Sequence, residues 1–190
     1  MKHEPENLTA QQSLDIITSM IQQVKGNAQK HSFHFLLWGW VVVLANLGMY
    51  TLTRMEFEYP YVVWLVTIPA WFTSFYVGYK TRKDDRVYTH YDFIHLSLWI
   101  GFGIVIFTLV GFGYKINYQI NPLIITISSI PTFLSGVMMR FRPLMIGGVL
   151  FWIFGVIGFL TPIENQPLVG AVAIFCGYLI PGYILKRKKD

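Results

Sequence analysis

Six long stretches of this 190-residue chain contain no aspartate, glutamate, lysine or arginine. Charged residues make up only 13% of the sequence, whereas a soluble domain usually carries about 25%. Hydrophobic residues make up 54%. This shortage of charge argues against a water-soluble fold and indicates that lipid is the solvent for most side chains.

Cysteine and catalytic motifs are also scarce. Cys176 is the single cysteine, which excludes an intramolecular disulfide and a CxxC motif, and we expect it to behave as a small buried apolar residue. The sequence has no GxSxG elbow, HExxH zinc helix or glycine-rich phosphate loop. No ionisable residue lies deeper than about one turn in an apolar stretch, which argues against proton-coupled transport. We therefore expect neither an enzyme nor a bound cofactor.

The uncharged stretches are long enough to cross a bilayer, whose hydrocarbon core of about 30 Å needs roughly 20 residues of helix. Backbone polar groups in hydrocarbon must bond within their own segment, so each stretch is predicted to be a helix. Short loops then predict three antiparallel hairpins in an all-α, polytopic membrane protein. The predicted spans are 33–53, 60–79, 93–114, 120–139, 143–161 and 167–185, between an N-terminal cytoplasmic segment (1–32) and a basic tail (186–190).

Lysine and arginine are divided very unequally between the two sides that these spans define. On the side opposite the N-terminus lie only Arg54 and Lys115 of the 15 basic residues. Because cytoplasmic loops carry the excess of lysine and arginine, we predict a multi-pass protein of the inner (cytoplasmic) membrane with both termini inside. The basic residues form short clusters beside apolar stretches, so nucleic acid is not an expected partner.

The second, fourth and sixth spans resemble one another. Pro60 and Pro122 open the second and fourth spans, and Pro69 and Pro131 follow after the same nine-residue interval. The sixth span opens at Pro167 but lacks the second proline at that interval. One interpretation is a triplicated hairpin around a pseudo-threefold axis. The other is that proline simply favours helix starts.

Hydroxyl side chains share a face in two of these spans: Thr67 and Ser74 in the second, and Ser128, Thr132 and Ser135 in the fourth. An interior proline deprives a carbonyl of its helical donor, so this face could line a narrow polar path, as broken helices do in transporters. Alternatively, the hydroxyls bond backbone groups and pack helices together, as they commonly do in lipid. The second interpretation is the favoured one.

An amphipathic helix is predicted at about 8–30, before the first span. No apolar signal-peptide segment precedes it, so the first span is expected to act as an uncleaved insertion signal. The polar face of this helix is mostly glutamine, serine and threonine, whereas a lipid-surface helix usually carries lysine there. We expect it to pack on the protein's own loops, on a second copy or on a cytoplasmic partner. Its apolar stripe comprises Ala10, Leu14, Ile17, Ile21, Val24 and Ala28.

Histidines form the one candidate ligand cluster. His31 and His34 stand at the start of the first span, and Asp92 and His95 at the start of the third. Residues three apart share a helix face, so these four side chains could bind Zn²⁺ or Fe²⁺ if the two spans touch. A protonation switch and haem ligation between His34 and His95 are further alternatives. The simplest interpretation is that interfacial histidines lie among lipid headgroups.

The segments YPYVVWLVTIPAWF, INPLIITISSIPTFLSG and GYLIPGYILK carry a resemblance to a family. The chain resembles the small six-span inner-membrane proteins of bacteria, which share an N-terminal polar helix followed by three hairpins and have no characterised activity. The resemblance implies no catalytic residues. Three functions stay open: a non-enzymatic scaffold or regulator, a passive channel or carrier for a small neutral solute, and a metal- or haem-binding protein.

Overall fold

The computed structural model describes residues 10–84 and 90–187, with side chains described for 32–80 and 93–187. These residues form helices joined by short connections and include no strand. Six segments are long and apolar enough to cross a membrane, which confirms an all-α protein with six candidate spans. They are Ser32–Arg54, Pro60–Lys80, Phe93–Gly111, Ile120–Met138, Arg142–Phe159 and Ile163–Arg187.

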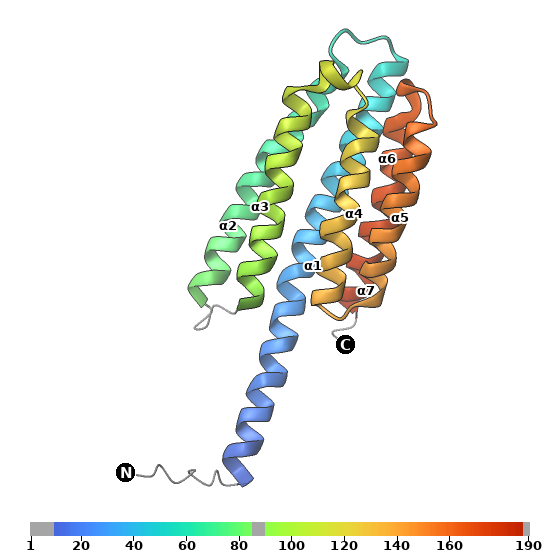
Figure 1. Ribbon diagram of the computed structural model, residues 1–190. Coiled ribbons are helices and arrows are strands. Elements are labelled where there is room, and N and C mark those ends of the chain that lie inside the picture. Colours follow the sequence, from blue (N-terminus) through green and yellow to red (C-terminus); the bar gives the residue numbers. More distant parts are fainter. Residues whose placement is uncertain (1–9, 85–89, 188–190) are drawn as a thin grey trace.

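Helix α1 runs without a break through Ala10–Arg54, a length of 45 residues. The sequence suggested a separate N-terminal helix followed by the first span, but the two are one helix that projects beyond the bundle (Figure 1). No proline lies between residues 10 and 54, so no backbone donor is missing along this stretch. The change from polar to apolar sequence alters the surroundings of the helix and leaves its backbone intact.

The second and sixth spans depart from uniform α-helix near their prolines. The second begins as a 3₁₀ helix, Pro60–Val66, and continues as α2, Thr67–Asp84. The sixth comprises α6, Gln166–Ile174, a π-helical turn, Phe175–Leu179, and α7, Ile180–Arg187. Pro69 and Pro181 have no N–H for the carbonyls of Leu65 and Gly177, which accounts for the altered hydrogen-bond pattern at both places.

The remaining elements lie between these spans. Helix α3 spans His90–Gly111 and is followed by a 3₁₀ turn, Gly113–Ile116. Helices α4, Ile120–Met138, and α5, Arg142–Phe159, follow. A last 3₁₀ turn, Ile163–Asn165, leads into α6.

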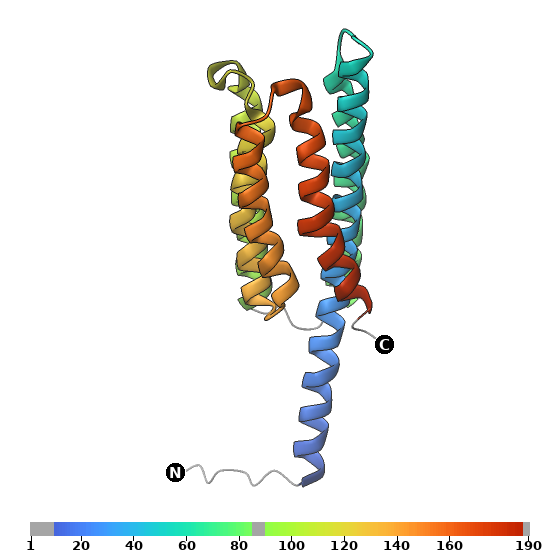
Figure 2. The ribbon, with the colours of Figure 1, turned by 90° about the vertical axis from the view of Figure 1, so that its right-hand side faces the viewer.

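The helices divide into a packed part and an open part. Helices α4 and α5 form the most extensive contact, and α6 packs against both α1 and α5. In Figure 2, α6 lies between the layer that contains α1 and the layer that contains α5. Half of the sixth span is buried, compared with 6% of the second span and none of the third. Helices α2 and α3 therefore line the outside of the bundle.

One end of the bundle, where α2, α4 and α7 finish, carries Lys80, Arg140, Arg142, Lys186 and Arg187. We call it the basic end. The extension of α1 leaves the bundle at this end (Figure 1).

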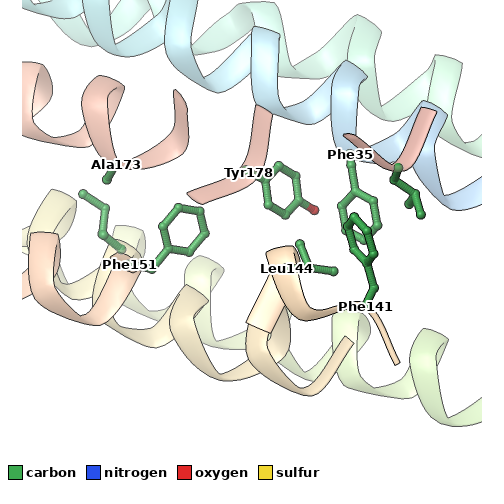
Figure 3. Packing of buried hydrophobic residues seen from close by; sticks show 8 residues of the cluster. Phe35, Phe141, Leu144, Phe151, Ala173 and Tyr178 are labelled. Atoms are coloured by element: carbon green, nitrogen blue, oxygen red, sulfur yellow. The ribbon is translucent and has the colours of Figure 1, made fainter. Parts of the chain in front are cut away.

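Tyr178 lies at the centre of the hydrophobic core (Figure 3). Its ring meets Phe35 of α1 edge-on, with centroids 5.0 Å apart, and lies nearly parallel to Phe151 of α5 at 6.1 Å. Leu144 and Ala173 are also buried in this cluster. The π-helical turn that contains Tyr178 thus joins α1 to α5.

Candidate functional site

The first polar contact at the basic end joins α1 to α2. His34 places Nδ1 2.9 Å from Oγ of Ser74. The indole N–H of Trp38 donates a longer hydrogen bond, 3.4 Å, to the same oxygen. Ser74 therefore links a histidine and a tryptophan of the neighbouring helix at the point where the first span begins.

A second contact of the same kind joins α3 to α4. His95 places Nδ1 3.5 Å from Oγ of Ser135, and the ring of Trp99 lies next to that of His95 with centroids 6.3 Å apart. Ser135 is fully buried. In both contacts the tryptophan follows the histidine by four residues and the serine follows it by 40.

Sequence reasoning missed this correspondence, although a signal was present. The segments HFLLW (34–38) and HLSLW (95–99) match in three of five positions, and a phenylalanine precedes each serine by two residues. The two sets are 61 residues apart, whereas the prolines of the second and fourth spans are 62 apart. When the spans are aligned by their prolines, at an offset of 62, His34 and His95 fall one position out of register.

The predicted metal site falls partly outside the described side chains. Those of His31 and Asp92 are not described, whereas those of His34 and His95 each contact a serine. Among the described side chains, no group of three or more histidine, cysteine, aspartate or glutamate residues could hold a metal ion. The four-ligand site stays a prediction. The bond between Nδ1 of His34 and Ser74 leaves Nε2 as the nitrogen through which His34 would bind a metal or haem.

The hydroxyl face predicted for the fourth span lies inside the bundle. Ser128, Thr132 and Ser135 are all buried. The hydroxyl of Ser128 donates to the carbonyl of Ile124 at 2.6 Å. Within the described part of the chain, Thr132 Oγ1 is the buried side-chain atom that has no hydrogen-bond partner.

The two hydroxyls predicted on the second span are placed elsewhere. Thr67 donates to the carbonyl of Trp64 at 2.7 Å, and Ser74 bonds His34. Helix α2 packs on α1, and α2 and α4 are not a substantial packing pair. Of these hydroxyls, Ser74 bonds across the α1–α2 contact and Ser135 lies at the α3–α4 contact. The bonds of Thr67 and Ser128 stay within their own spans.

A partly buried amide pair lies towards the end opposite the basic end. The side chain of Asn121 in α4 donates to Oδ1 of Asn46 in α1 at 2.7 Å, and Asn46 donates to the carbonyl of Val42 at 2.9 Å. Gly170 of α6 packs against both amides, because a Cβ there would lie 2.7–2.8 Å from their oxygens. Nothing in the sequence pattern indicates that these two asparagines meet. They provide a polar link between α1 and α4, against which α6 packs.

Comparisons of the chain with protein families, with curated proteins and with solved structures found no match.

Proposed function

We propose that this chain is a non-enzymatic inner-membrane scaffold or regulator with both termini in the cytoplasm, and that it engages a cytoplasmic partner or a second copy through the extension of α1. The observation that carries the proposal is the continuity of α1. The membrane span takes 23 of its 45 residues, so the other 22, residues 10–31, prolong the same helix beyond the bundle. At 1.5 Å per residue the extension is about 33 Å long.

The base of the extension is held by close contacts with the last span. A Cβ at Gly39 of α1 would lie 2.6 Å from Leu179, and one at Gly182 of α7 would lie 3.2 Å from Leu36. Trp40 also donates a hydrogen bond to the hydroxyl of Tyr183 at 3.0 Å. These contacts fix the direction in which α1 leaves the bundle, as a scaffold that presents a helix to a partner requires.

The sequence pattern indicates which face of the extension would bind. Its apolar stripe recurs at alternating intervals of four and three, which is typical of a helix that packs on another helix. The proposed orientation is supported by the basic end, because the excess of lysine and arginine marks the cytoplasmic side.

A pair of matched substitutions tests the proposal. Ile17→Asp places a charge on the apolar stripe, and Ser19→Asp places the same charge on the polar face. In cells that express the full chain, crosslinked or copurifying partners, including a second copy, should be lost with Ile17→Asp and retained with Ser19→Asp. The same partners at the same yield with both variants would contradict the proposal.

The phase of the helix offers an independent check. Two residues inserted between Gln29 and Lys30 turn the stripe by about 200°, whereas seven inserted residues return it to within about 20° of its direction. We expect the two-residue insertion to abolish partner binding and the seven-residue insertion to retain it. Equal binding by both insertions would show that the direction of the stripe is irrelevant.

Within the bundle, we propose that the α1–α2 and α3–α4 pairs are repeats of one hairpin. The two histidine–serine contacts support this, because they join corresponding helices at the same end. The proposed orientation has a test of its own: in cysteine labelling of intact cells, a cysteine at Lys188 should be unreactive from the periplasmic side.

A second candidate function is passive passage of a small neutral solute along the hydroxyl face of α4. The unpartnered hydroxyl of Thr132 favours it, since buried polar groups are normally bonded. Flux of glycerol and urea into vesicles that contain the protein should fall when Ser128 and Thr132 are replaced by leucine. Unchanged flux rules this candidate out.

A third candidate is metal or haem binding through His34 and His95, each of which has Nδ1 near a serine hydroxyl. Elemental analysis and an absorbance spectrum of the pure protein test it, and a blank result in both ends it.

A further inference from the structure

A groove lies between α4 and α5 on the outer surface of the bundle and has a volume of about 320 Å³. Its walls are exposed bulky side chains, among them Phe133 of α4 and Val149 and Trp152 of α5. Gly148 is buried between these walls, and the surface is indented there because glycine has no side chain to fill it. We call this feature the α4–α5 groove; in a bilayer it opens towards the acyl chains.

An occupant of the α4–α5 groove meets mainly hydrocarbon and aromatic surface. Ser129 is the hydroxyl residue among those that line the groove, and it already donates a hydrogen bond to the carbonyl of Thr126 at 2.6 Å. A polar ligand would lose its bonds to water here without gaining equivalent ones. A flexible hydrocarbon chain has no such bonds to lose.

The α4–α5 groove lies at the depth of a single lipid leaflet. Arg142, Met145, Val149 and Trp152 follow one another at intervals of three, four and three, so they share one face of α5. At 1.5 Å per residue, Trp152 lies about 15 Å from Arg142 along the helix. This is half of a hydrocarbon core of about 30 Å. The groove therefore reaches from the side of the basic end to about the middle of the bilayer, as one acyl chain does.

Two arginines stand where the headgroup of such a lipid would lie. Arg142 begins α5 on the face that forms the groove, and Arg140 precedes it in the turn after α4. Both side chains are exposed, and within the described part of the chain neither guanidinium has an ion pair or a hydrogen bond. Arg54, at the opposite end, is instead paired with Glu164. The arginines beside the groove thus offer positive charge that no carboxylate of the described chain neutralises.

We propose that the α4–α5 groove and these two arginines form a binding site for an anionic phospholipid, with one acyl chain in the groove and the phosphate at Arg140 and Arg142. Arginine suits this headgroup, because its guanidinium can bind two phosphate oxygens at once. A second copy of the chain is a poorer occupant, since a copy in the same orientation would bring its own basic end to the same depth and add like charge. The proposal does not depend on the function assigned to the α1 extension.

Native mass spectrometry of the full chain in detergent tests the charge selectivity. Phosphatidylglycerol and phosphatidylcholine with identical acyl chains are added separately, and the affinity for the first bound lipid is measured. Each basic residue near an anionic surface contributes about fivefold. We therefore expect the wild type to bind phosphatidylglycerol roughly 25-fold more tightly than phosphatidylcholine, and Arg140→Gln/Arg142→Gln to bind the two lipids about equally.

The matched control for the arginines is Lys186→Gln/Arg187→Gln. It removes the same charge from the same basic end, but from α7 and not from beside the groove, so it should keep the preference for phosphatidylglycerol. Equal binding of the two lipids by the wild type, or the same loss of preference in both double variants, overturns the proposal.

A second pair of variants tests the groove itself. Val149→Trp fills the groove, whereas Val156→Trp makes the same substitution seven residues further along the same face of α5, beyond the residues that line the groove. Both valines are exposed, so neither substitution disturbs the packing inside the bundle. Phosphatidylglycerol with a diazirine in the middle of one acyl chain should crosslink to the groove in the wild type and in Val156→Trp, and Val149→Trp should lose most of this crosslink. Equal crosslinking in the two variants, or crosslinks spread evenly over the exposed helix faces of the wild type, overturns the proposal.

The native mass spectra also distinguish a lipid from a second copy of the chain. The expected result is one phosphatidylglycerol retained for each chain of 22.0 kDa. A lipid-free species of twice that mass, converted to single chains by Val149→Trp, would assign the groove to a second copy and would overturn the lipid site.

Discussion

The contact between α4 and α5 predicts a large and specific response to a single methyl group at Gly148. In Gly148→Ala the new Cβ would lie 2.7 Å from both N and Cβ of Phe133 and 2.8 Å from its Cα. Carbon atoms in contact prefer about 3.5–4.0 Å, so α4 and α5 must separate locally by about 0.8 Å or more. Backbone atoms supply most of the clash, and a change of rotamer cannot relieve it.

The energetic consequence follows from that separation. A radial gap of about 0.5–1 Å forfeits a quarter to a half of each dispersion contact along the seam. Together with residual strain, overpacking of this kind costs about 1–3 kcal/mol. Gly103→Ala is the matched control, because a Cβ at Gly103 meets nothing within 4 Å. It should range from no change to a gain of about 1 kcal/mol from helix propensity.

Equilibrium unfolding of the purified protein in a denaturing detergent, followed by tryptophan fluorescence, measures the difference. We expect Gly148→Ala to unfold at a clearly lower detergent fraction than Gly103→Ala. Free energies of unfolding that agree within about 0.5 kcal/mol, well below the overpacking cost, would refute the close approach of α4 and α5.

Three further predictions concern polar contacts. A double-mutant cycle on Asn46→Ala and Asn121→Ala should give a coupling energy of about 0.6–1.7 kcal/mol in the same unfolding assay, as side-chain hydrogen bonds between spans do; additive effects would contradict the amide pair. His34→Ala and Ser74→Ala should likewise be coupled by about 0.5–1.5 kcal/mol, and independence would place the two side chains apart. Arg54→Gln should change stability by less than about 1 kcal/mol, because its contacts to Glu164 and Asn165 are exposed; a larger loss would indicate a buried role.

The six spans were predictable because lipid imposes a length and a composition that can be read directly from the sequence. The bounds of the second and fourth spans differ from the prediction by a single residue at one end. The third was predicted three residues too long, since the apolar sequence continues after α3 ends at Gly111. The chain forms a 3₁₀ turn, Gly113–Ile116, shortly after that point, and hydropathy alone does not reveal where a helix gives way to a turn.

The helix contacts were less accessible to sequence reasoning. Ser74 and Ser135 both lie beside a histidine of another helix, but Ser74 is half-buried and Ser135 is fully buried. Which neighbour each serine meets depends on the packing order of the spans, and apolar composition does not encode that order. Asn46 and Asn121 meet only because α1, α4 and α6 converge at Gly170. The continuity of α1 was missed for a different reason, because a change of polarity was taken for a boundary.

Because the backbone of α1 is unbroken, we expect the position of its far end to depend on the thickness of the membrane that the span crosses. Transmembrane helices adjust their tilt to the local hydrocarbon thickness, and α1 has no joint between its span and its extension. A change of tilt of about 10° would carry the far end of an arm about 33 Å long sideways by about 6 Å. A small mechanical adjustment inside the bilayer thus becomes a displacement as large as a side chain in the aqueous phase.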